Sequence, residues 1–120
     1  MVTATSASIT NINKKLKQVR AVDSTKNSSR FFQNHICEMI IVIIYQYCID
    51  FSPNNDIEYL LSSQIALWAC RAINNLSKNS TIKMKFIEIG AKETVFTLGE
   101  RYGNSKNTVE WINIAKEGLN

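Results

Sequence analysis

The sequence has few turn-forming residues and almost none of the motifs that carry catalysis. Its 120 residues include one proline and four glycines, too few for the dense turns of a β-sandwich or barrel. The single histidine, His35, excludes most metal sites and Ser-His-Asp triads. Gly-rich phosphate loops and Gly-x-Ser-x-Gly or His-Glu-x-x-His motifs are also absent. We therefore expect a mostly helical protein that is not an enzyme and uses no cofactor or metal.

Long apolar runs and paired cysteines are missing as well. The longest apolar run, 39–45, is far too short to span a bilayer, and residues 1–10 lack the pattern of a signal peptide. The three cysteines, Cys37, Cys48 and Cys70, form no Cys-x-x-Cys pair, which is typical of a reducing compartment. We expect a cytoplasmic protein without a membrane partner, with the nucleus as the alternative location, and cysteines that serve as small buried hydrophobes.

Charge is distributed unevenly along the chain. The net charge is +4, from 14 Lys and Arg against 10 Asp and Glu. Residues 1–30 hold six bases and one acid, whereas residues 31–120 are close to neutral. This pattern argues against a protein that coats nucleic acid uniformly, and it indicates a basic N-terminal segment.

Hydrophobic periodicity predicts helices over most of the chain. A weakly amphipathic helix is expected over 4–21, followed by a polar connector over 22–29. The segment 30–51 is rich in β-branched residues, but its length and lack of turn signals favour a helix that is apolar nearly all round and therefore buried. The other expected helices are 56–77 with Asp56 as cap, 82–89 ending at Gly90, 91–102, and 107–119 with Asn107 or Thr108 as cap.

The chain contains a degenerate internal repeat. A shift of 55 residues aligns the apolar pattern of 31–41 with that of 86–96. A shift of 43 residues places Trp68, Ala72 and Leu76 on Trp111, Ala115 and Leu119. A period near 43 residues with three helices per unit is typical of an α-solenoid. The two tryptophans are expected in the core, because their phase with Ala72 and Ala115 fits packing between stacked helices.

One part of the repeat resembles the armadillo family. The segment 69–77 reads Ala-Cys-Arg-Ala-Ile-Asn-Asn-Leu-Ser, and Phe-Ile-Glu-Ile-Gly-Ala follows at 86–91. In that family a long third helix ends in an Ala-Leu-x-Asn-Leu-Ser type sequence, and a short first helix then ends at Gly-Ala or Gly-Gly. The resemblance implies an all-α, armadillo-like right-handed α-solenoid, with HEAT-type repeats as near relatives. The single domain 1–120 would then consist of a partial repeat, 1–29, and two repeats, 30–77 and 78–120.

The resemblance also implies a binding groove lined by third helices. Residues 8–12 match 72–76, so Asn11 and Asn75 would offer amides to a partner's backbone. Arg71, one turn before Asn75, suits an acidic partner residue, and Lys78 follows the helix end. The alternatives are helix-end capping for the asparagines and an ion pair with a neighbouring Glu for Arg71. The family's third-helix tryptophan falls on Arg71, so the Trp ladder that holds basic peptides is missing.

These observations predict a protein–protein interaction module, a scaffold or adaptor that binds a partner's peptide or helix. Lys14, Lys15, Lys17 and Arg20 would form a basic rim of the groove, on the end of a third helix and the connector after it. Two other interpretations stay open. One is a basic-armed helical module that binds nucleic acid or an acidic surface. The other is a structural subunit that self-associates through the open ends of its solenoid.

Overall fold

The computed structural model describes the backbone of residues 2–24 and 30–120, and the side chains of residues 9–20 and 35–120. These residues form helices and no strand, so the predicted all-α class is confirmed. No helix within them is long and apolar enough to cross a membrane. The elements are α1 (Val2–Ser24), α2 (Arg30–Ile44), the π-helix η1 (Tyr45–Ile49), α3 (Asp56–Leu76), α4 (Ser80–Glu88), α5 (Ala91–Arg101) and α6 (Lys106–Gly118).

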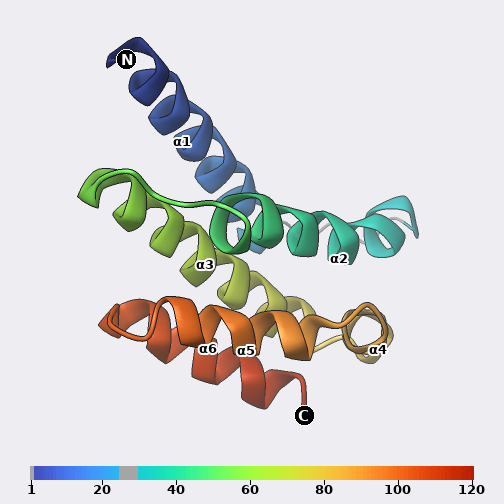
Figure 1. The fold of residues 1–120 in the computed structure, drawn as a ribbon. Coiled ribbons are helices and arrows are strands. Elements are labelled where there is room, and N and C mark those ends of the chain that lie inside the picture. Colours follow the sequence, from blue (N-terminus) through green and yellow to red (C-terminus); the bar gives the residue numbers. More distant parts are fainter. Residues whose placement is uncertain (1, 25–29) are drawn as a thin grey trace.

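The helices are arranged in two layers. In one layer, α3 packs against α1 on one side and against α6 on the other, and the three helices run in the same general direction (Figure 1). In the other layer, α2 and α5 run in the opposite direction, and α4 crosses at one end (Figure 1). The layers meet where α2 contacts α3 and α5 contacts α6. The outer sides of α1, α3 and α6 therefore share one broad face of the molecule.

The core is built from small residues of α3 and larger residues of the surrounding helices. Ala66, Ala69 and Ala72 of α3 are buried, and their small size lets neighbouring helices approach closely. Phe86, Tyr102 and several isoleucines fill the space between the layers. All three cysteines are buried and unpaired, as expected for small hydrophobes.

Two predicted helix caps are wrong by one or more residues. α3 is capped by Asn55, not Asp56, because Asn55 has the extended backbone that lets its side chain accept from the Glu58 amide at 2.9 Å. α6 begins after Ser105 rather than at Asn107 or Thr108. The Thr108 hydroxyl lies 2.8 Å from that of Ser63 on α3, so it joins two helices instead of capping one.

The helix predicted over 30–51 differs from expectation in its last turn and in its burial. α2 ends at Ile44 and continues as the π-helix, in which the Asp50 amide donates to the Tyr45 carbonyl. One side of α2 is buried against α3, α4 and α5, as expected. The other side is not, since Met39 is 48% exposed and Val42 is 58% exposed. The prediction of burial all round is therefore wrong for that side.

Gly90 ends α4 as predicted, and its backbone makes a first substitution test. Its φ of +88° lies in the left-handed region, which costs other residues about 1–2 kcal/mol. We expect Gly90→Ala to lower the free energy of unfolding by that amount, measured by urea denaturation. Gly99 is the matched control, because it lies inside α5 and an added Cβ would make ordinary contacts with Lys116 Nζ at 3.5 Å and Ile112 Cγ2 at 3.6 Å. Equal stability of the Gly90→Ala variant and the wild type would contradict the assignment.

Candidate protein-binding surface

Arginine and tryptophan side chains alternate across the α1–α3–α6 layer. The Arg20 guanidinium carbon of α1 lies 5.0 Å from the ring centroid of Trp68 on α3. The Arg71 guanidinium carbon, also on α3, lies 4.6 Å from the Trp68 ring and 5.4 Å from the Trp111 ring of α6. These four residues, Arg20, Trp68, Arg71 and Trp111, are called the Arg–Trp row below. They connect all three helices of the layer by cation–π contacts.

The helix spacing and the parallel packing together produce this row. Trp68 and Arg71 are three residues apart, so they share one side of α3. Both tryptophans are half-buried and pack against the hydrophobic core. The prediction that the tryptophans pack against the core is confirmed. The sequence did not predict their contacts with the arginines. Those contacts depend on how α1 and α6 are placed against α3.

The contacts fix the position and orientation of the positive charges. Each cation–π contact contributes about 0.5–2 kcal/mol, more where the pair is shielded from water. Arg71 is half-buried between two indole rings, which restricts its otherwise mobile side chain. A guanidinium directs its N–H donors outward in its own plane, and this fork matches a carboxylate. The row is thus suited to recognising acidic groups.

Arg71, Asn75 and Lys78 lie close together at the C-terminal end of α3. Asn75 is half-buried one turn after Arg71, on the same side of the helix. Lys78 is exposed in the turn that follows, where its amide donates to the Asn75 carbonyl at 3.4 Å. The structure therefore brings together three of the four residues predicted to contact a partner.

Asn11, the fourth residue, lies elsewhere. It precedes Arg20 by nine residues, about two and a half turns, and so projects from the opposite side of α1. The two asparagines also differ in position along their helices. α3 ends directly after Asn75, whereas α1 continues to Ser24, far beyond Asn11. The register that aligned Asn11 with Asn75 is therefore not the observed one.

The predicted basic rim is spread around α1. Lys14, Lys15, Lys17 and Arg20 all lie inside the helix, because α1 extends to Ser24 and includes the first part of the predicted connector; residues 25–29 lie outside the described chain. Lys17 and Arg20 share the side of the Arg–Trp row, since they are three residues apart. Lys15 instead lines a cavity between α1 and α2. Only part of the basic segment thus borders the row.

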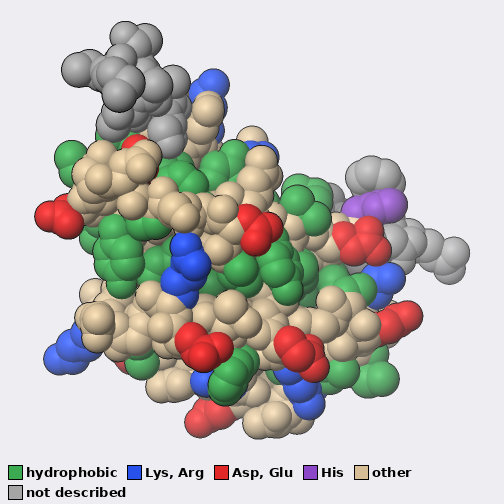
Figure 2. All heavy atoms as spheres, viewed as in Figure 1, with side chains coloured by type: hydrophobic (Ala, Val, Ile, Leu, Met, Phe, Trp, Pro, Cys, Tyr) green, Lys and Arg blue, Asp and Glu red, His purple; other side chains and the backbone are tan. Residues whose placement is uncertain are grey.

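The two described cavities lie away from the Arg–Trp row. One, of about 290 Å³, is formed between α1 and α2, and the other, of about 230 Å³, between α5 and α6 near Phe96 and Lys116. Neither is lined by a member of the row. On the α2–α5 face, acidic and basic side chains are interspersed (Figure 2). That mixture does not form the single-sign surface on which broad phosphate binding depends.

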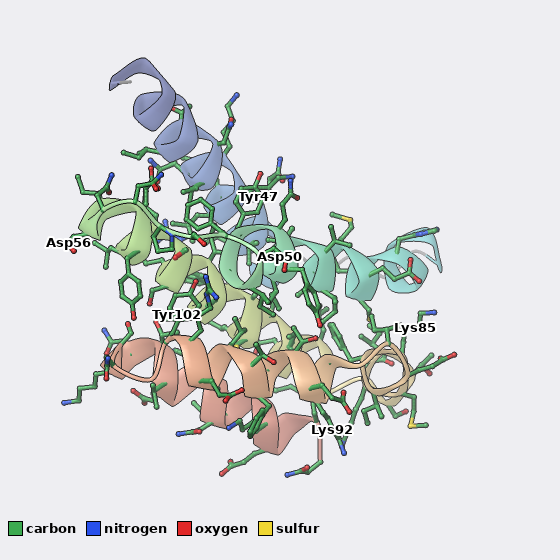
Figure 3. The ribbon with its side chains drawn as sticks, viewed as in Figure 1. Tyr47, Asp50, Asp56, Lys85, Lys92 and Tyr102 are labelled. Atoms are coloured by element: carbon green, nitrogen blue, oxygen red, sulfur yellow. The ribbon has the colours of Figure 1, made fainter. Side chains whose placement is uncertain are left out.

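The buried thiols and the buried tyrosine hydroxyl stay protonated near neutral pH. Burial raises the pKa of Cys37 to about 11 and that of Cys70 to about 12, so both thiols stay protonated and poorly nucleophilic near neutral pH. Burial, and then the proximity of Cys48, raises the pKa of Tyr102 to about 12. Tyr102, at the end of α5 (Figure 3), donates toward the Cys48 carbonyl and Ser62 Oγ, each at 3.1 Å. The Tyr102 hydroxyl thus links the end of α5 to η1 and α3.

Comparison with known proteins identified no relative. No protein-family model, no curated protein and no solved structure matches the chain.

Proposed function

We propose that the chain is a protein–protein interaction module of armadillo-like architecture, and that the Arg–Trp row binds an acidic segment of a partner protein. The observation that carries the proposal is the Arg71 guanidinium held 4.6 and 5.4 Å from two indole rings. A charge fixed in this way loses little further entropy when it pairs with a carboxylate.

The arrangement of the helices supports the armadillo-like part of the proposal. In this interpretation α1, α3 and α6 are third helices of successive units, α2 and α5 are second helices, and α4 is a first helix. The parallel packing of α1, α3 and α6 agrees with that order, as does the left-handed glycine between α4 and α5. A right-handed α-solenoid built from repeats 30–77 and 78–120 would expose the row on its third-helix face.

The chemistry of the row suggests how a partner segment would bind. Partner Asp or Glu side chains would pair with Arg71 and Arg20, while aliphatic parts of the segment would cover the indole rings. Asn75 would hydrogen-bond a backbone amide of an extended segment, and Lys78 would add positive charge at the end of the row. Aromatic and arginine residues are enriched among the residues that dominate binding energy at interfaces.

A peptide selection tests the proposal. We expect random 12-residue peptides selected by display on the wild-type protein to be enriched in Asp and Glu. Binding of a selected peptide should weaken at least about tenfold on Arg71→Gln, because a charged hydrogen bond of about 1.5–3 kcal/mol is lost. Lys106→Gln is the control, since it removes the same charge from an exposed position at the start of α6.

The opposite results would identify the other interpretations. If Arg71→Gln and Lys106→Gln weakened peptide binding equally, binding would depend on general charge attraction and not on a site at the Arg–Trp row. Binding of labelled DNA or RNA that falls steeply with salt and is lost on neutralising Lys14, Lys15 and Lys17 would favour the nucleic-acid module. Self-association that rises with protein concentration and is unchanged by Arg71→Gln would favour the structural subunit. Circular dichroism of each variant checks that the helices are intact.

A further inference from the structure

The exposed side of α2 and the neighbouring side of α1 form a second surface, separate from the Arg–Trp row. Met39 and Val42 are exposed there, although the segment was expected to be buried. They line the α1–α2 cavity of about 290 Å³ together with other residues, among them Lys15 and Gln18 of α1, Ile43 of α2 and Gln46 of η1.

Helical geometry places this cavity on a different side of α1 from the row. Gln18 precedes Arg20 by two residues, which rotates it about 200° around the helix. On α2, Met39, Val42 and Ile43 follow the i, i+3, i+4 spacing of one helix side, over a length of about 6 Å. The surface is therefore an apolar strip of about one turn on α2, with polar residues of α1 and Gln46 of η1 beside it.

The composition of the cavity lining suits a helix. An amphipathic helix binds a partner by placing side chains at i, i+3 or i+4, and i+7 into an apolar groove. Met39, Val42 and Ile43 supply the apolar lining, and methionine adapts its shape to different side chains. Lys15, Gln18 and Gln46 offer polar atoms at the edge for the other side of such a helix.

The charges beside the cavity select the partner. On α1, Lys15 lines the cavity, and residues 9–20 of that helix include no acidic residue. The acidic residue at the cavity, Glu38, lies 3.5 Å from Lys85 of α4, which offsets its charge. A second copy bound symmetrically on this surface would bring two basic α1 helices together, and like charges across an interface are costly. A helix with acidic residues along one edge avoids that cost.

We propose that the α1–α2 cavity is the docking site for an amphipathic helix of a partner protein, with aliphatic side chains seated on Met39 and Val42 and acidic residues beside Lys15. This site is independent of the Arg–Trp row. Loss of either site leaves the other in place, because they lie on different sides of α1.

A display selection with helical peptides tests the proposal. The probe is a display library of peptides on a helix-forming scaffold with random residues at all exposed positions, selected on the wild-type protein. Enriched peptides should carry aliphatic residues at i, i+3 or i+4, and i+7, flanked by Asp or Glu. Binding of the best peptide should weaken at least about tenfold on Val42→Glu, which places a charge in the apolar lining. It should be unchanged on Met84→Glu, an exposed position of α4.

A charge swap defines the orientation and distinguishes the two sites. Lys15→Glu should weaken the acidic peptide about tenfold, and a peptide with its acids replaced by lysine should recover binding to that variant. Arg71→Gln should have no effect on this peptide. Selected peptides that lack acids, or that bind the Val42→Glu variant as well as the wild type, would overturn the proposal. Concentration-dependent dimerisation of the wild type that is abolished by Val42→Glu would overturn it in favour of a second copy.

Discussion

Raising the pH above about 9 is expected to lower the free energy of unfolding steeply. Burial raises the pKa of Cys37 from 9.0 to about 11, that of Cys70 from 9.0 to about 12, and that of Tyr102 from 10.0 to about 12. Between the unfolded and folded pKa values, the unfolded chain has released protons that the native protein still holds. Each such group then removes about 1.4 kcal/mol of stability per pH unit. The stabilisation is complete below pH 9 and is lost as the pH rises toward 12.

Urea unfolding at a series of pH values measures this loss. Cys70→Ala removes one of the titrating groups, so its stability should decline less steeply above pH 9 by about 1.4 kcal/mol per pH unit. Tyr102→Phe should flatten the curve above about pH 10, the unfolded value for a tyrosine. The comparison uses slopes, so the packing lost in each variant does not enter. A free energy of unfolding that stays level from pH 8 to pH 11 would show that these groups are accessible to solvent.

Phe86→Ala is expected to remove about 3–5 kcal/mol of stability, a large share of the 5–15 kcal/mol typical of a domain. Phe86 is fully buried on the short helix α4, which contacts α2, α3 and α5. Truncating the ring removes apolar contacts and leaves a cavity where these helices meet. The remaining tie between α2 and α4 includes a weak Cys37 Sγ to Ile82 carbonyl contact at 3.8 Å, which cannot compensate.

The matched control for this variant lies two residues away. Met84 is on the same helix and is 64% exposed, so Met84→Ala should change stability by no more than about 0.5 kcal/mol. Chemical denaturation of both variants gives the two values directly. If Phe86→Ala cost no more than Met84→Ala, α4 would not be anchored by its ring in solution.

Much of the local structure was predictable from the sequence, and part of the candidate site followed from it. Apolar spacing located the helices, and Gly90 marked the end of α4 because only glycine adopts its backbone conformation without cost. The grouping of Arg71 with Asn75 followed from a spacing of four residues on one helix. Arg20 was assigned only to a basic rim. Its equivalence to Arg71 was hidden, because the helix expected over 4–21 ends in the structure only at Ser24.

The sequence by itself determined the all-α class and the approximate helix boundaries, because periodicity and glycine preferences act over a few residues. Only the tertiary structure decided which residues of different helices meet. The register of α1 against α3 depends on how the buried side chains of the two helices fit together where they pack. That register places Arg20 on Trp68, and it leaves Asn11 on the opposite side of α1, away from the Arg–Trp row. It also left Met39 and Val42 exposed, because burial depends on which helices cover α2 and not on its own apolar composition.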